Sequence, residues 1–354
     1  MIDLRAHRRA LVFLASVLEV PVVHRTALRL GKRPEVVVTT VDGVPVEEVR
    51  PAGEAPLPTF VFFTGAHPLR RREPLVRQVT HGLARAGYQV FLPELPGLGE
   101  GEIGVRTLEV AVAVTRATAA RPEVANGRVA LLGASAGASI ALLAAADPQL
   151  VDRVSLVVAV APFADLEKMV CLATAGAYEE PSGRFEAYAA DDLLRRVVTR
   201  SLIAFLPDPD RAVLRAELGP LEGEDPAELD RLRNRAAALT RPSHALLELL
   251  DNRDAARFRD LCADLPAEVI DTVRQLSPIH AAPGIRAPVE IVVPPRDVYF
   301  PAGEATALAK ALPHARLTTT GTLDHTRPST SLRRLRELRG FYDFAVRSLA
   351  VAAQ

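Results

Sequence analysis

One serine set among small residues limits the folds open to this chain of 354 residues. The pentapeptide Gly133–Gly137 (G-A-S-A-G) follows the apolar run Val129–Leu132, which predicts a buried strand. It precedes the Ala- and Leu-rich run Ala138–Ala146, which predicts a helix. A serine at such a sharp strand-to-helix turn adopts a strained backbone conformation, and its small neighbours let strand and helix approach closely. The turn therefore lifts the Ser135 hydroxyl clear of the sheet, where a nucleophilic serine must stand.

Strand patterns and helix patterns alternate on both sides of this turn. The predicted strands are Glu35–Val41, Val44–Val49, Thr59–Phe63, Tyr88–Leu92, Val129–Leu132, Val154–Val160, Val289–Val293 and Arg316–Thr320. The predicted helices between and after them are Pro74–Ala86, Thr107–Ala120, Glu304–Leu312 and Thr330–Ala350. The turn Asp42-Gly43 joins the first two strands as a hairpin. This alternation favours an α/β fold with a mostly parallel sheet covered by helices on both faces.

The alternation stops between about Ala164 and Pro283, where clear strand patterns are lacking. Helical patterns there, at Asp192–Phe205, Pro226–Ala238 and Ser243–Leu250, indicate several short helices rather than a second sheet. We therefore expect four segments. They are an N-terminal extension (1–34), the first part of the sheet core (35–163), a helical insertion (164–284) and the second part of the core (285–354).

The N-terminal extension superficially resembles a signal peptide, because arginines precede the apolar run Leu11–Leu18. Glu19 and Pro21 interrupt that run, no small-residue cleavage site follows, and the run is too short to span a bilayer. We expect an amphipathic helix that packs against the body of the protein or a partner subunit, in preference to a membrane surface. Its predicted apolar face comprises Leu4, Leu11, Leu14 and Leu18.

The composition argues against several classes of function. Acidic and basic residues balance at 43 each, so nucleic acid is not an expected partner. Cys171 and Cys262 are the two cysteines, which form no disulfide framework and fit a cytoplasmic protein. The eight histidines are scattered without metal-ligand spacing, so we expect neither a metal nor another cofactor.

An acid and a histidine follow two later strands. Asp297 lies in the loop Pro294–Pro301, directly after the predicted strand Val289–Val293. His325 lies in the loop Gly321–Arg327, after the last predicted strand and 325 − 297 = 28 residues further on. Open α/β sheets place their ligand sites beyond the carboxyl ends of the strands. We therefore expect the side chains of Ser135, Asp297 and His325 to meet at one edge of the sheet.

These residue types together define a chemistry. A serine hydroxyl is a weak nucleophile and needs a base within hydrogen-bond reach, a role that suits His325. Asp297 would orient the imidazole and stabilise its charged form. Backbone N–H groups of Ala136 and Ala66 would hold the oxyanion. We predict hydrolysis of a small-molecule carboxylic ester or thioester through an acyl-enzyme.

The chain resembles the α/β-hydrolase superfamily from roughly Thr59 to Arg347, apart from the insertion. The motifs that carry the resemblance are G-x-S-x-G at Gly133–Gly137, D-x-x-F-P at Asp297–Pro301, the terminal His325, and a lead-in formed by Leu276–His280 and Ile285–Val289. One departure is Thr64, which stands where the family's oxyanion segment usually has a histidine before the glycine. The resemblance implies an α/β-hydrolase fold in which the insertion forms a helical cap or lid over the active site.

Several residues compete with these assignments. Asp165 follows the strand Val154–Val160 and is the alternative acid, because some relatives carry it there. His67 either lines the pocket or has a structural role beside Pro68. We interpret Asp324 as a solvated loop residue and His280 as a structural residue near the sheet.

Two other functions compete with the esterase or thioesterase hypothesis. One is a peptidase or amidase of the same fold, which the lack of an evident propeller or terminus-binding domain disfavours. The other is a non-catalytic binding protein that kept the fold, and its support is the departure at Thr64. Oligomeric state and acyl-chain length stay open at this point.

Overall fold

The structure, a computed structural model, describes residues 3–18, 31–53, 56–180, 182–223, 225–328 and 335–354. An eight-stranded sheet forms the centre of the protein, with strand order β1-β2-β4-β3-β5-β6-β9-β10. Its strands are β1 (Pro34–Val41), β2 (Val44–Pro51), β3 (Thr59–Phe63), β4 (Gln89–Pro93), β5 (Val129–Ala134), β6 (Val154–Val160), β9 (Val289–Val293) and β10 (Ala315–Thr319). The hairpin β1–β2 is antiparallel and joins β4 antiparallel, whereas β4, β3, β5, β6, β9 and β10 pair in parallel. The predicted mostly parallel sheet is therefore confirmed.

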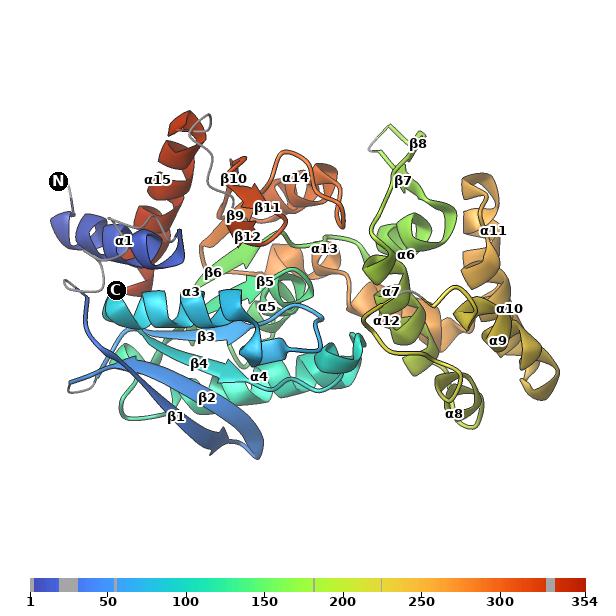
Figure 1. Cartoon of the computed structure of the whole chain (residues 1–354), viewed down its shortest axis with the longest axis horizontal. Coiled ribbons are helices and arrows are strands. Elements are labelled where there is room, and N and C mark those ends of the chain that lie inside the picture. Colours follow the sequence, from blue (N-terminus) through green and yellow to red (C-terminus); the bar gives the residue numbers. More distant parts are fainter. Residues whose placement is uncertain (1–2, 19–30, 54–55, 181, 224, 329–334) are drawn as a thin grey trace.

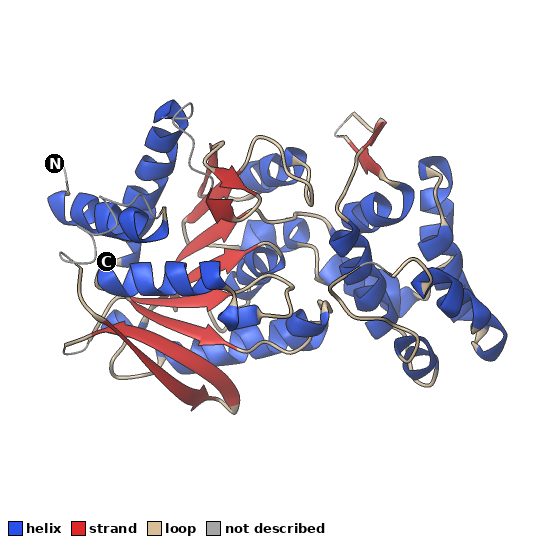
Figure 2. Ribbon diagram, viewed as in Figure 1, coloured by secondary structure: helices blue, strands red, loops and turns tan. Residues whose placement is uncertain are grey.

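Helices cover both faces of the sheet (Figures 1 and 2). One face carries α1 (Leu4–Val17), α3 (Pro74–Arg85) and α15 (Leu335–Ala352), and the other carries α4 (Val105–Ala119), α5 (Ala136–Ala145) and α14 (Ala302–Ala311). Strand β3 shows how the sequence builds the two cores, because alternate side chains of a strand point to opposite faces. Phe60 and Phe62 belong to the core beneath α1, α3 and α15, and Val61 and Phe63 belong to the other. The predicted start of the last helix, at Thr330, lies outside the described residues.

Helix α1 packs against both α3 and α15, so the predicted contact with the body of the protein is observed. The predicted apolar face is wrong at Leu4 and Leu11, which are 77% and 58% exposed, whereas Leu14 is buried as predicted. The buried side also includes Ala6 and Ala10. Helices α1 and α3 approach closely, since a Cβ at Gly82 of α3 would come within 3.2 Å of the Phe13 ring. Across the described residues, no helix is both long and apolar enough to cross a membrane.

The segment between β6 and β9 is largely helical, as predicted, and lies to one side of the sheet in Figure 1. Its helices are α6 (Leu166–Ala175), α7 (Asp192–Ala204), α8 (Asp210–Arg215), α9 (Glu228–Asn234), α10 (Arg241–Asp251), α11 (Phe258–Ala263), α12 (Ala267–Gln275) and α13 (Pro278–Ala281). The prediction of no strands there is corrected by a small hairpin, β7 (Ala177–Glu179) and β8 (Phe185–Ala187). Three residues are too few to show the alternation by which a strand is recognised in a sequence.

Short elements complete the fold. They are the two-residue pair β11 (Leu323–Asp324) and β12 (Arg327–Pro328), and the 3-10 turns Arg70–Arg72, Leu98–Glu100, Ala125–Gly127, Ala236–Ala238, Ala255–Arg257 and Ala282–Gly284. The pair β11–β12 encloses the turn that carries His325.

A buried carboxylate ties the helical segment to the sheet core. Glu304 of α14 is 1% exposed and accepts hydrogen bonds from the backbone N–H groups of Ala164 and Asp165, at 2.8 and 2.9 Å. Tyr178 of β7 donates its hydroxyl to the second carboxylate oxygen at 3.1 Å. Burial raises the pKa of Glu304, because the charged form loses its solvation. One side chain thus joins three separate segments of the chain.

Candidate active site

Ser135 stands at the turn between β5 and α5. Its backbone angles are φ 54° and ψ −128°, a conformation that non-glycine residues rarely adopt. The flanking glycines leave no room for a side chain. A Cβ at Gly133 would lie 2.4 Å from the Cα of Ala138, and one at Gly137 would lie 2.2 Å from the carbonyl oxygen of Phe63. The G-x-S-x-G pattern is therefore required by the close contact of α5 with β5 and β3.

The turn also lies at a reversal in the order of the strands. The chain passes from β3 to β4 on one side and then returns to β5 on the other side of β3. Such a reversal opens a crevice at the carboxyl ends of the two strands. Ser135 follows β5 and the loop from Thr64 to Ala66 follows β3, so both meet in that crevice.

The loop after β3 lies directly against Ser135. A Cβ at Gly65 would come within 3.2 Å of Ser135 Cβ and 3.7 Å of Ser135 Oγ. Ala136 is the first residue of α5, where a helix leaves backbone N–H groups without an intrahelical partner. The structure thus places Ala66 and Ala136, the predicted oxyanion residues, in the lining of the same cavity as Ser135. Thr64 is buried at the start of the loop and lines the cavity as well.

His325 and Asp297 are joined by a hydrogen bond of 2.7 Å between Nδ1 and Oδ2. The side chain of Asp297 is only 4% exposed and that of His325 12%. The other carboxylate oxygen of Asp297 accepts from the backbone N–H groups of Tyr299 and Phe300, at 2.7 and 3.3 Å. Both oxygens of Asp297 are therefore engaged, and the bond to Nδ1 orients the imidazole of His325, which lines the cavity.

Three aromatic residues around this pair were not assigned from the sequence. The rings of Tyr299 and Phe300 lie 4.5 and 5.5 Å from the ring of His325. Tyr188 donates its hydroxyl to the backbone carbonyl of Asp297, and burial raises the pKa of that hydroxyl to about 12. The adjacency of Tyr299 and Phe300 to Asp297 was the available signal for those two. Tyr188 lies in the helical segment between β6 and β9, and no sequence pattern marked it.

The competing residues have other surroundings. Asp165 caps α6, accepting from the backbone N–H of Glu167 at 3.0 Å. Asp324 is exposed, as interpreted from the sequence.

His67 lines the cavity, and its Nδ1 accepts from the backbone N–H of Leu69 at 3.1 Å. His280 is exposed on the short helix α13, so the prediction of a structural role near the sheet is wrong. The lead-in pattern misled here because its buried polar member is Ser277, which accepts from the backbone N–H of Leu166.

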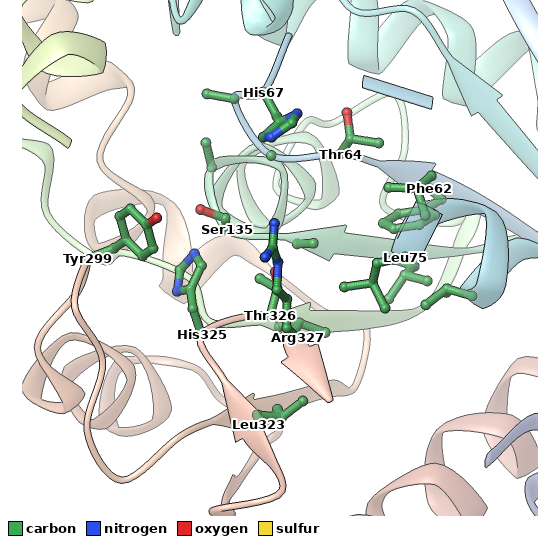
Figure 3. Close-up of a pocket in the computed structure, with 18 of the residues that line it drawn as sticks. Phe62, Thr64, His67, Leu75, Ser135, Tyr299, Leu323, His325, Thr326 and Arg327 are labelled. Carbon is green, nitrogen blue, oxygen red and sulfur yellow. The ribbon is translucent and has the colours of Figure 1, made fainter. Parts of the chain in front are cut away.

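A cavity of about 370 Å³ joins these side chains. Ser135 and His325 project into the same space, with Tyr299 on the far side of His325 and the Thr64 and His67 loop opposite (Figure 3).

The two cysteine thiols do not line this cavity, and burial raises the pKa of both Cys171 and Cys262 to about 12. Within the described parts of the chain, no three His, Cys, Asp or Glu side chains gather as they would around a metal ion.

Comparison with known proteins points to one fold. A family model described as alpha/beta hydrolase fold matches residues 75–192. Among solved structures, dipeptidyl peptidase 4 of Porphyromonas gingivalis superposes with a TM-score of 0.53 at 13% identity, covering 94% of this chain and 37% of that one. An acylaminoacyl peptidase gives a TM-score of 0.51 at 12% identity, covering 89% of this chain and 41% of that one.

This chain therefore spans less than half the length of either peptidase. Est1E from Butyrivibrio proteoclasticus gives a TM-score of 0.49 at 13% identity, covering 89% of this chain and 99% of that one. A comparison with curated protein sequences found no match. The matched family model and the sheet with its serine turn agree that the chain has the α/β-hydrolase fold.

Proposed function

We propose that this protein is a serine hydrolase that cleaves a carboxylic ester or thioester through an acyl-enzyme. The observation that carries the proposal is the 2.7 Å hydrogen bond between His325 and a buried Asp297, in a cavity that Ser135 also lines. An oriented imidazole next to a serine on a strained turn is the arrangement that activates a hydroxyl for attack on a carbonyl.

The reaction proceeds in two halves. Ser135 Oγ attacks the carbonyl carbon of the substrate while His325 Nε2 takes the hydroxyl proton. The tetrahedral intermediate collapses, the bond to the leaving oxygen or sulfur breaks, and His325 gives its proton to the leaving alcohol or thiol. Water then attacks the acyl-enzyme with His325 again as the base, and the carboxylic acid leaves as Ser135 regains its proton. Asp297 keeps the ring oriented throughout and stabilises its charged form.

The backbone N–H groups of Ala136 and Ala66 stabilise the negative charge of each tetrahedral intermediate. Both residues line the cavity beside Ser135, and the contact of Gly65 with Ser135 supports this role for the loop after β3. These donors belong to the backbone, so a threonine at position 64 removes neither of them. Such groups contribute most when they are aimed at the oxyanion before the reaction starts.

We further propose that residues 164–284 form a cap domain on the core. Support comes from α7, where Leu193, Leu194 and Val197 line the cavity that contains Ser135. Residues 35–163 and 285–354 then form the catalytic core in two parts, preceded by the N-terminal extension 1–34.

Hydrolysis of p-nitrophenyl acetate and p-nitrophenyl butyrate tests this proposal. The wild-type protein should hydrolyse both, and Ser135→Ala should lower kcat by about a thousandfold or more, because the nucleophile is lost. Circular dichroism of the variant checks that the fold is retained. Equal rates for the wild-type protein and a folded Ser135→Ala variant would contradict the proposal.

A peptidase or amidase is the second candidate, because two neighbours with a TM-score above 0.5 are named as peptidases. Matched pairs of p-nitrophenyl esters and p-nitroanilides with the same acyl group separate the two. We expect a higher kcat/KM for the ester of each pair. A higher value for the anilides would favour the peptidase.

A further inference from the structure

The cavity at Ser135 continues away from the catalytic side chains, between the sheet and the helices α1, α3 and α15. On the sheet side its lining comes from one face of three adjacent strands, namely Phe60 and Phe62 of β3, Leu132 and Ala134 of β5, and Val158 and Val160 of β6. In Figure 3, Phe62 and Leu75 lie to the right of Ser135 and His325, and Leu323 lies below them. The continuation is apolar on its sheet side.

The helix side of the cavity shows how deep it reaches. Both α3 and α15 begin near the edge of the sheet that carries the catalytic loops, since α3 follows the loop after β3 and α15 follows the His325 loop. Lining residues extend along α3 from Leu75 to Leu83 and along α15 from Phe341 to Leu349. Eight residues of helix correspond to about 12 Å at 1.5 Å per residue. The cavity therefore descends well below the catalytic edge.

Helix α1 closes this space from outside. It packs against both α3 and α15, and its Phe13 and Val17 line the cavity. On α15, Ser348 is 4% exposed, and its hydroxyl has no hydrogen-bond partner among the described residues. Apart from Ser348, the side chains named along this part of the cavity on α1, α3, α15 and the three strands are apolar.

We propose that this space is a tunnel for the acyl chain of the substrate, which makes long, unbranched fatty acyl esters or thioesters the substrate class. The tunnel is defined by the named lining residues of β3, β5, β6, α1, α3 and α15. This inference rests on the proposed function, because it places the carbonyl carbon of the acyl group at Ser135. An apolar chain in an apolar space is stabilised by removal of its surface from water.

The tunnel receives the acyl group rather than the leaving group because the two ends of the cavity differ in polarity. The deep end is apolar, and the end at His325 is polar. The lining residues Asp324 and Arg327 are exposed and lie beside His325 at the mouth. A polar leaving group placed there departs directly into solvent. The acyl group, which stays bonded to Ser135 until water attacks, is the part that benefits from a long buried contact.

A series of p-nitrophenyl esters from acetate to palmitate tests the inference. We expect kcat/KM to rise by up to about fourfold for each added methylene until the tunnel is full, and then to level off or fall. Lengthening the alcohol side of a fixed butyrate ester should produce no comparable rise. A profile that is flat or falls beyond butyrate, or a rise confined to the alcohol side, would overturn the acyl tunnel.

A matched pair of variants locates the effect. Ala345 of α15 is 2% exposed and lines the tunnel, whereas Ala350 lies on the same helix outside the lining. Ala345→Leu should lower the ratio of kcat/KM for laurate to that for butyrate by about tenfold or more, because the added atoms occupy space for the chain. Ala350→Leu should keep the wild-type ratio. Equal ratios in the two variants would contradict the placement of the tunnel.

Binding without turnover separates this inference from the proposed function. Calorimetric titration of the Ser135→Ala protein with saturated fatty acids from butyrate to palmitate should show affinity that increases with chain length. Tight binding of long chains by a protein that hydrolyses no ester would retain the tunnel and refute the hydrolase. Ester hydrolysis at Ser135 without any binding of long chains would refute the tunnel alone.

Discussion

Asp297 uses both of its carboxylate oxygens, one for the Nδ1 of His325 and one for the backbone N–H groups of Tyr299 and Phe300. This leaves a single orientation for the carboxylate and, through it, for the imidazole. Asp165, the other acid considered, uses its carboxylate to cap α6. The two aspartates therefore offer a direct comparison between an orienting role and a capping role.

Replacement by Asn should lower kcat at Asp297 and leave it unchanged at Asp165. In Asp297→Asn the amide presents an N–H group to His325 Nδ1 and favours the wrong tautomer, so kcat for ester hydrolysis should fall by about a thousandfold or more. Asp165→Asn should keep kcat, because Asn caps a helix about as well as Asp. Steady-state kinetics of both variants shows which aspartate orients the imidazole. Loss of activity in Asp165→Asn with retention in Asp297→Asn would reverse the assignment of the acid.

The two cysteines allow a separate test of which side chain is the nucleophile. Burial raises the pKa of Cys171 and Cys262 to about 12, so almost no thiolate is present at pH 8. Treatment with iodoacetamide at pH 8 should therefore leave ester hydrolysis at its starting rate over an hour. Rapid inactivation that disappears in a Cys171→Ser or Cys262→Ser variant would show that a thiol, and not Ser135, carries the activity.

The sequence was sufficient to predict Ser135, Asp297 and His325 as a group, because each follows an apolar strand and parallel strands end at the same edge. Their hydrogen bonding could not be predicted in the same way. Tyr188 reaches the backbone of Asp297 from 109 residues away in sequence, through the packing of the helical segment. No local pattern encodes such a contact, since it depends on how two distant segments meet.

At the scale of elements, the tight contact between β5, α5 and β3 fixes the serine turn. A Cβ at Gly137 would come within 2.2 and 2.4 Å of the carbonyl oxygens of Phe63 and Thr64. These are backbone atoms of a central strand and its loop, which have no room to move. The glycine is therefore a requirement of packing as well as of the turn.

Gly137→Ala should lower the free energy of unfolding by about 3 kcal/mol or more, because a methyl group must displace the end of β3. Gly284→Ala is the matched control, since a Cβ there meets no atom within 4 Å. Denaturation with urea measures both variants. A Gly137→Ala protein as stable as Gly284→Ala would mean that α5 does not lie this close to β3.

The central strands could be predicted from sequence because they are buried runs of apolar residues, as in Val154–Val160 and Val289–Val293. The buried face of α1 could not. Hydrophobic size pointed to Leu4 and Leu11, which are exposed, whereas the smaller Ala6 and Ala10 are buried. Apolar patterns identify a helix, but which of its faces is buried depends on the elements packed against it, here α3 and α15.

At the scale of the whole molecule, Glu304 holds the sheet core and the helical segment together. It accepts two backbone N–H groups after β6 and the hydroxyl of Tyr178 in β7. Burial raises its pKa above the ordinary value of 4.5, so the folded protein binds a proton at Glu304 more tightly than the unfolded chain does. The contribution of this group to stability therefore decreases as pH rises above about 4.5.

Replacing Glu304 by Gln should remove that pH dependence while retaining an oxygen that accepts the two backbone N–H groups. The free energy of unfolding of the wild-type protein minus that of Glu304→Gln should decrease as pH is raised from about 4.5 towards neutrality. Urea denaturation of both proteins across this range provides the measurement. A difference that grows with pH would show that the folded protein favours the charged carboxylate.

The cavity is a property of the whole molecule and lay beyond sequence reasoning. Its walls come from three strands, from α1, α3 and α15, and from α7 of the helical segment. Each of those residues has the pattern of an ordinary core position. Only the assembled layers show that these residues line one cavity together with Ser135.

Labelling with a fluorophosphonate tests the central claim most directly, because this reagent forms a covalent bond with a serine only where a base and an oxyanion site activate it. The folded wild-type protein should acquire one adduct, located by peptide mass spectrometry at Ser135. The heat-denatured protein and the folded Ser135→Ala variant should acquire none. A folded wild-type protein that stays unlabelled, or that is labelled at another residue, would contradict the assignment of Ser135 as an activated nucleophile.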